Sequence, residues 1–302
     1  MVVAAISAGA APAGCSKRKT TGPAVGAGER GVASIHVVDG GGSGAPIQLV
    51  FQYTLNESRA YRVKARQTID LPAVYDAGVD RSVIDQTSRL IERVVATGDA
   101  GADVETTFAD VKLTIAGPLS ALAAELERAT AAYRVETRVG PDGVVRGIKA
   151  DPSAAPLLKT WLSATSRQLA SGPAVFPSEP VAVGGVWRRV EPVAEGAPGT
   201  NEPSWSGDLT TEYLLVGVEA GAATIRVATK LALRGTVPKH GTRLAVETTG
   251  SAKGQMTFDI PKGIVVRSRL DFVTETRTTG REIPAVAPTK IEGWTETELE
   301  KT

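Results

Sequence analysis

The chain has few of the side chains that most often act as nucleophiles, general bases or metal ligands. The sequence has one cysteine, Cys15, and two histidines, His36 and His240. With a single thiol the chain cannot form an intramolecular disulfide, so its folding depends on packing. A metal site needs several converging ligands, and neither H-x-x-x-H nor C-x-x-C spacing occurs. A general base needs a rigid setting, and both histidines fall in segments with the composition of a linker or a loop. The sequence therefore predicts no catalytic, metal or cofactor site.

Other motifs of catalysis or cofactor binding are missing or lie in the wrong context. The sequence contains no G-x-S-x-G elbow and no P-loop. Residues 26–31 satisfy G-x-G-x-x-G, but no apolar strand precedes them and no helix follows, so we reject a dinucleotide site. Glu125 and Glu127 do not share one helix face, which disfavours paired acid–base chemistry there. With 34 cations against 33 anions, the chain also lacks the basic excess that nucleic-acid binding requires. These observations favour a protein that is not an enzyme.

The sequence around the single cysteine suggests a different use for its thiol. Residues 2–13, VVAAISAGAAPA, carry no charge and are too short to span a bilayer, which takes about 20 residues. Pro12-Ala13-Gly14-Cys15 resembles a bacterial lipobox, in which small residues precede an acylated cysteine. The resemblance implies a signal peptide at 1–14, lipid attachment at Cys15 and a membrane anchor, with the cations at 17–19 beside anionic headgroups. Two features depart from the pattern: no basic residue follows Met1, and Pro12 replaces the usual leucine. An apolar amino terminus with a chance cysteine is the alternative.

The elements that follow are mostly strands. Residues 15–45 are rich in Gly, Ala, Ser and Thr and predict a flexible tether, interrupted at most by a short strand at 32–39. Beyond it the apolar period is two, as in 60–71. In 103–115 the apolar parity switches, which predicts a bulge near Ala109-Asp110. Residues 82–96 also fit a helical stripe, but their β-branched end favours a strand.

Two helices are predicted, over 117–133 and 151–172, with a hairpin between them that turns at Pro141-Asp142-Gly143. The predicted fold class is α+β, mostly antiparallel β: a curved sheet or half-barrel of long hairpins with two helices. Alternation with one polar side is typical of such sheets.

An internal sequence repeat suggests that the fold consists of two duplicated halves. VVATGDAGA at 94 aligns with LLVGVEAGA at 214, and DGVVRG at 142 aligns with KGIVVRS at 262, so both pairs are 120 residues apart. We therefore expect a first β-rich half over 46–172 and a second over 173–300. Coincidence between glycine-centred hairpins is the alternative, and the halves could also form one continuous domain.

Residues 173–187 join the halves and contain F-P-x-x-P-V-x-V-G-x-x-W. The matching residues are Phe176, Pro177, Pro180, Val181, Val183, Gly184 and Trp187. This segment, with the glycine-turn hairpins, resembles a family of uncharacterised bacterial lipoproteins. The resemblance implies a location in the bacterial cell envelope, periplasmic or at the outer membrane, and a β-rich fold, but no activity. Phe176, Trp187 and Trp205, which lies in the polar stretch NEPSWSG, are the candidate ligand-binding or structural surface.

Two functions remain open at this stage. The first is a binding protein that holds an apolar ligand such as lipid in a concave sheet. The second is a structural or protein-interaction lipoprotein with a filled core. A continuous apolar pocket of several hundred Å³ would favour the first, and a solid interior would favour the second.

Overall fold

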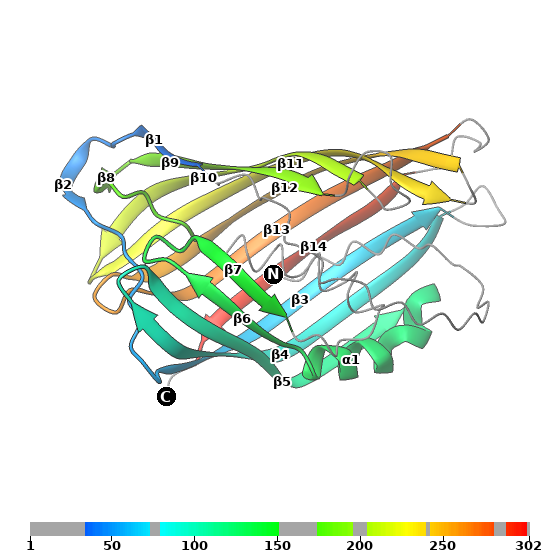
Figure 1. Ribbon diagram of the computed structural model, residues 1–302, viewed down its shortest axis with the longest axis horizontal. Coiled ribbons are helices and arrows are strands. Elements are labelled where there is room, and N and C mark those ends of the chain that lie inside the picture. Colours follow the sequence, from blue (N-terminus) through cyan, green and yellow to red (C-terminus); the bar gives the residue numbers. More distant parts are fainter. Residues whose placement is uncertain are drawn as a thin grey trace, which may run out of the picture.

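The computed structural model describes residues 34–72, 79–150, 174–195, 204–239, 242–280 and 288–300. Most of these residues belong to one antiparallel sheet of twelve strands, in the order β1-β9-β10-β11-β12-β13-β14-β3-β4-β5-β6-β7. The sheet is long, open and strongly curved (Figure 1). The predicted class, mostly antiparallel β with a curved sheet, is confirmed.

Eleven of the twelve strands form two five-stranded arms and one strand that joins them; the twelfth, β1, pairs with the outer edge of the second arm. The first arm contains β3 (Ser58–Pro72), β4 (Val79–Gly98), β5 (Gly101–Ala116), β6 (Arg134–Val139) and β7 (Val145–Ala150). The second arm contains β9 (Val186–Glu195), β10 (Ser204–Glu219), β11 (Ala222–Lys239), β12 (Thr242–Asp259) and β13 (Ile264–Thr279). The joining strand is β14 (Thr289–Leu299), which pairs with β13 on one side and β3 on the other. The halves therefore share one sheet.

Two further strands lie in the region expected to be tether. β1 (Ser34–Asp39) pairs with β9 at the outer edge of the second arm, and β2 (Ser43–Ile47) pairs with the short β8 (Val181–Val183) in a separate two-stranded sheet. β1 is the short strand expected within the tether. The folded body therefore includes residues from Ser34 onward, earlier than the expected boundary at residue 45.

Local features of the first arm follow the sequence pattern. Residues 82–96 lie within β4, as predicted. The register of β4 with β5 shifts between Thr87 and Arg89, and Asp110 opposite this shift has φ 50°, which confirms the bulge. The hairpin between β6 and β7 turns as predicted, with Gly143 at φ 79°.

The prediction of two helices is corrected. The described residues contain one α-helix, α1 (Ala123–Ala131), directly preceded by a 3₁₀ turn, η1 (Pro118–Leu122). The predicted helix over 117–133 is thus a 3₁₀ turn followed by a shorter α-helix, and neither start has a side-chain cap. The predicted second helix, over 151–172, lies outside the described residues.

The helix covers an open edge of β5. Strand β6 pairs only with the first part of β5, as far as Thr107. Further along, the backbone N–H of Leu113 donates a 3.0 Å hydrogen bond to the Glu127 carboxylate of α1. Because unpaired strand edges invite other chains, the helix protects this part of the sheet.

Glycines allow neighbouring strands to approach closely near the centre of the sheet. A Cβ atom at Gly254 of β12 would lie 1.9 Å from the carbonyl oxygen of Arg269, and one at Gly293 of β14 would lie 2.1 Å from that of Arg66. Only glycine permits such a close approach of neighbouring strands.

The two arms are also linked at one end of the sheet, which we call the closed end; it carries the turns at 99–100, 140–144, 220–221 and 260–263. Residues 48–57, the crossing segment, span this end, at the left of Figure 1. The N–H of Phe51 donates to Pro141 of one turn (2.9 Å), and the N–H of Gln52 donates to Gly263 of another (3.1 Å). The largest apolar cluster fills this end: Leu49, Ala174, Val175, Phe176, Val181, Trp187, Tyr213, Leu215, Ala223, Ile225, Val227, Met256, Phe258 and Val265.

Candidate functional site

The residues singled out from the sequence lie in three different settings. Phe176 and Trp187 are fully buried in the closed-end cluster, so they form core rather than a ligand-binding surface. Trp205 lies half-buried near the start of β10, with its ring against Gly235 of β11. Cys15 lies outside the described residues, as does His240, and the side chain of His36 is exposed on β1.

The F-P-x-x-P-V-x-V-G-x-x-W residues act through packing. The indole of Trp187 stacks on Tyr213 with ring centroids 5.3 Å apart, and its Nε1 donates a 2.7 Å hydrogen bond to the carbonyl oxygen of Val175. The ring of Phe176 meets that of Phe258 edge-on at 4.6 Å. Burial raises the pKa of Tyr213 to about 12. Gly184 has φ 88° and donates its N–H to Leu215 (2.8 Å), which fixes the turn between β8 and β9.

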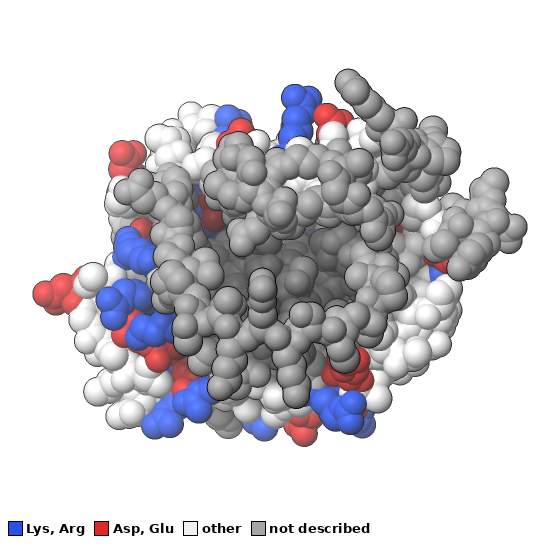
Figure 2. Space-filling view, turned by 45° about the vertical axis from the view of Figure 1, so that its right-hand side comes forward, with Lys and Arg blue, Asp and Glu red and all other residues white. Residues whose placement is uncertain are grey.

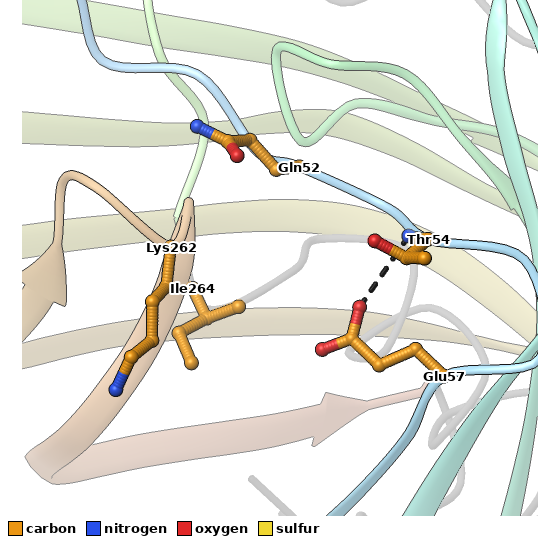
Figure 3. Close-up of a pocket in the computed structure, with 5 residues that line it drawn as sticks. All are labelled: Gln52, Thr54, Glu57, Lys262 and Ile264. Carbon is orange, nitrogen blue, oxygen red and sulfur yellow. Dashed lines mark hydrogen bonds between the residues drawn. The ribbon is translucent and has the colours of Figure 1, made fainter.

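A pocket of about 340 Å³ opens at the closed end (Figure 3). Its lining combines the crossing segment with the turn between β12 and β13: Gln52, Thr54, Glu57, Lys262 and Ile264. Most of these side chains are polar or charged. The pocket therefore differs from the continuous apolar pocket that a lipid-binding function predicts.

A charged cluster lies beside this pocket. Arg59, largely buried, donates hydrogen bonds to both carboxylate oxygens of Glu57, at 2.8 and 2.9 Å, and its guanidinium lies over the Tyr53 ring at 5.7 Å. Hydrogen bonding to Arg59 lowers the pKa of Glu57. Burial raises the pKa of Glu92, opposite Arg59 on β4, and the nearby Glu57 charge acts in the same direction, against the attraction of Arg59. Arg59 is therefore shared between two carboxylates in unlike environments.

The concave face of the sheet has an unusual centre. Three successive inward positions of β12 are Gly250, Ala252 and Gly254, and the inward positions on the neighbouring strands include Gly293 of β14 and Ala65 of β3. Inward positions of a sheet that buries a core more often carry large apolar side chains. We call this strip of small residues near the junction of the arms the trough; Phe272 of β13 packs beside it.

Polar side chains border this trough on the first arm. We call them the central polar patch: Gln67 of β3, Gln86 and Ser88 of β4, and Thr295 of β14. None has more than 5% of its surface exposed. Sequence analysis missed this patch, although position 67 interrupts the apolar parity of 61–71 with a glutamine.

The convex face is charged. Ion pairs connect neighbouring strands across it, such as Arg81–Asp70, Arg138–Asp103 and Arg267–Glu296, each at 2.7 Å. In Figure 2, cations and anions alternate over the described surface without a broad patch of either sign. Pairs this exposed add little stability, but they mark the convex face as the one in contact with water.

Two kinds of feature are absent from the described part of the chain. Within it, no group of three or more His, Cys, Asp or Glu side chains is placed to hold a metal ion. Its helices include none with the length and apolar character needed to cross a membrane.

Comparison of the sequence with models of protein families and with curated proteins found no match. The resemblance to bacterial lipoproteins thus rests on the residues around Cys15 and the segment that ends at Trp187.

Proposed function

We propose that this protein is a lipid-anchored binding protein of the bacterial cell envelope, not an enzyme, and that it holds a lipid-like ligand along the trough of its curved sheet. The observation that best supports this proposal is the centre of the concave face, where glycine and alanine occupy inward positions beside large apolar side chains. An apolar cluster of Ile69, Ile84, Ile115, Ala252, Phe272 and Ile291 connects the two arms at this place. Apolar side chains beside a strip of small residues suit an acyl chain, because burying each methylene contributes about 0.8 kcal/mol.

The ligand-binding part of the proposal is tested by filling the trough. Ala65→Leu places a larger side chain at an inward position, whereas Ala232→Leu adds the same atoms at an exposed outward position of β11. Native mass spectrometry of the full-length chain, carrying Cys15→Ser to remove the attachment point, should show co-purified lipid for the parent and for Ala232→Leu. The bound mass should be lost in Ala65→Leu. A parent protein without bound mass would contradict lipid binding.

The anchor is tested independently. Cys15→Ser should move the protein from the membrane fraction to the soluble fraction, because stable attachment depends on the acyl chains. Ser16→Cys in the Cys15→Ser background is a matched control that restores a thiol one residue away and should not restore the anchor. Unchanged fractionation of Cys15→Ser would contradict lipidation at Cys15.

A structural or protein-interaction function is the second candidate. The closed end favours it, because the largest apolar cluster lies there and its rim exposes Val38 on β1 and both Val216 and Val218 on β10. Substituting Val216 and Val218 with threonine should leave lipid binding unchanged. If the second function is right, the same double variant should lose a partner that co-purifies with the parent.

A further inference from the structure

The central polar patch contains hydrogen-bonding atoms without a partner. Gln86 Nε2, Ser88 Oγ and Thr295 Oγ1 are buried, and no group in the described part of the chain accepts from or donates to them. Each unmade hydrogen bond of a buried polar group costs about 1–3 kcal/mol, so such groups need an explanation. Three of them in one patch suggest that a bound molecule supplies the partners.

The three atoms come from neighbouring strands in register. Thr295 and Gln86 both stand opposite Ala65, one on each side of β3, and Ser88 is the next inward residue of β4 after Gln86. Neighbouring strands are roughly 4.8 Å apart, so Thr295 and Gln86 flank the small Ala65 side chain at about twice that spacing. The polar atoms thus border the trough instead of being scattered over the face.

Several inward hydroxyls of the second arm do have partners. Thr211 Oγ1 lies 3.2 Å from Thr229 Oγ1, and Thr248 Oγ1 lies 3.0 Å from Thr276 Oγ1. These hydroxyls pair across neighbouring strands, whereas Ser88 and Thr295 of the patch have no such pair among the described residues.

The patch carries no charge. Its members are two amides and two hydroxyls, and neither the apolar cluster beside it nor the small residues of the trough supply a counter-ion. Burying an ionised head group without a partner charge is costly, whereas hydroxyl, ester and amide groups can exchange hydrogen bonds with these side chains. From this arrangement we infer that the central polar patch binds the uncharged polar head of an amphiphile, whose chain lies along the trough. This inference rests on the proposed binding function.

Three probes with C18 chains that each contain one double bond separate head-group recognition from chain binding. They are monooleoylglycerol, with an uncharged hydroxyl and ester head, oleyl sulfate, with an anionic head, and 1-octadecene, with no polar head. Each is delivered from a cyclodextrin complex to the delipidated full-length Cys15→Ser chain, and the dissociation constant is measured by titration calorimetry. Monooleoylglycerol should bind at least tenfold more tightly than the other two.

Substitutions in the patch then test which atoms select the head. Gln86→Leu and Thr295→Val should each weaken monooleoylglycerol binding about tenfold without weakening 1-octadecene binding. Each should also raise the midpoint of urea unfolding of the ligand-free protein, because an unpaired polar group has been removed. Thr211→Val is the matched control: it breaks the pair with Thr229, so it should lower the unfolding midpoint and leave all three affinities unchanged.

The outcomes distinguish the two proposals. Equal affinity for all three probes, or patch variants that lose stability and keep monooleoylglycerol affinity, would overturn head-group recognition and leave chain binding intact. The second result would show that the patch is structural, satisfied by ordered water. Failure of all three probes to bind would overturn the proposed binding function and this inference with it.

Discussion

Trp187 lies fully buried between chain segments that are distant in sequence. Its indole packs on Tyr213 of β10 and donates its N–H to Val175, in the segment that precedes β8. A buried carbonyl oxygen that loses its donor costs free energy in addition to the lost packing. This residue therefore connects the segment 174–177 to the second arm.

Trp187→Phe should lower the free energy of unfolding by about 2 kcal/mol, since it removes both the hydrogen bond to Val175 and part of the buried ring. Urea unfolding followed by circular dichroism measures the change. Trp294→Phe is the control: that indole is partly exposed and contacts Arg269, whose guanidinium lies 5.0 Å from the ring, so the loss should be below about 1 kcal/mol. Equal losses in the two variants would contradict the role assigned to Trp187.

Glu92 should make the protein less stable as the pH rises. Its pKa is raised in the folded state, chiefly by burial, so the folded protein holds this proton more tightly than the unfolded chain does. Stability from the protonated group is present below the unfolded-state pKa of about 4.3 and is lost as the pH rises through the higher folded-state pKa. Glu92→Gln should therefore be more stable than the parent at pH 8, with a difference that disappears near pH 4.

Glu57→Gln is the matched control with the opposite sign. Hydrogen bonding to Arg59 lowers the pKa of Glu57, so its contribution is present above the unfolded-state pKa and is lost as the pH falls through the folded-state value. Glu57→Gln should thus be less stable than the parent at pH 8. Urea unfolding at both pH values tests the pair. A Glu92→Gln variant that is less stable at pH 8 would show that attraction to Arg59 outweighs the loss of hydration.

At the scale of elements, the sequence predicts the strands and their local irregularities best. The parity switch at Ala109-Asp110 predicted the bulge, and the glycine turn at 141–143 predicted the hairpin of β6 and β7, because both signals are local. The place of β14 between β13 and β3 has no local signal, since it depends on pairing across most of the chain. The sequence did not predict the central polar patch for a similar reason. Gln86 and Thr295 become neighbours of Ala65 only through the pairing of β14, β3 and β4.

The close approach of neighbouring strands near the centre of the sheet depends on glycines in β12 and β14. Gly254→Ala and Gly293→Ala should each lower the free energy of unfolding by about 1–3 kcal/mol, because the new Cβ would overlap a carbonyl oxygen of the neighbouring strand. Gly217→Ala is the control, since a Cβ there meets no atom within 4 Å. It should be neutral or slightly stabilising in a strand. Thermal unfolding measures all three, and tolerance of alanine at both positions 254 and 293 would contradict the assigned role.

At the scale of the whole molecule, the two arms repeat one arrangement. Gly101 and Gly221 have positive φ at equivalent turns, as do Gly143 and Gly263, and each pair is separated by the 120 residues found in the sequence (101 to 221, 143 to 263). The arms differ between these turns, where residues 117–132 contain η1 and α1 but the second arm has extended β11 and β12. Internal duplication stays a prediction, but its expected glycine positions are matched.

The equivalent turns hold the crossing segment from both sides, so each turn should protect its own amide. The N–H of Phe51 donates to the turn that contains Gly143, and the N–H of Gln52 donates to Gly263 itself. A Cβ at Gly143 would lie 2.6 Å from the Phe51 ring, and one at Gly263 would lie 2.5 Å from the Gln52 nitrogen; both glycines also have positive φ. Gly143→Ala should therefore accelerate hydrogen exchange first at Phe51, and Gly263→Ala first at Gln52, measured by NMR under native conditions. Gly98→Ala, with no atom near its added Cβ, should accelerate exchange at neither amide.

The crossing segment closes this end of the sheet as one connector. Gly143→Ala and Gly263→Ala should therefore each also raise exchange at the other amide, to a smaller degree. Exchange that rises at only one amide would show that the two turns hold the segment independently, and the linkage of the arms at the closed end would then rest on the apolar cluster alone.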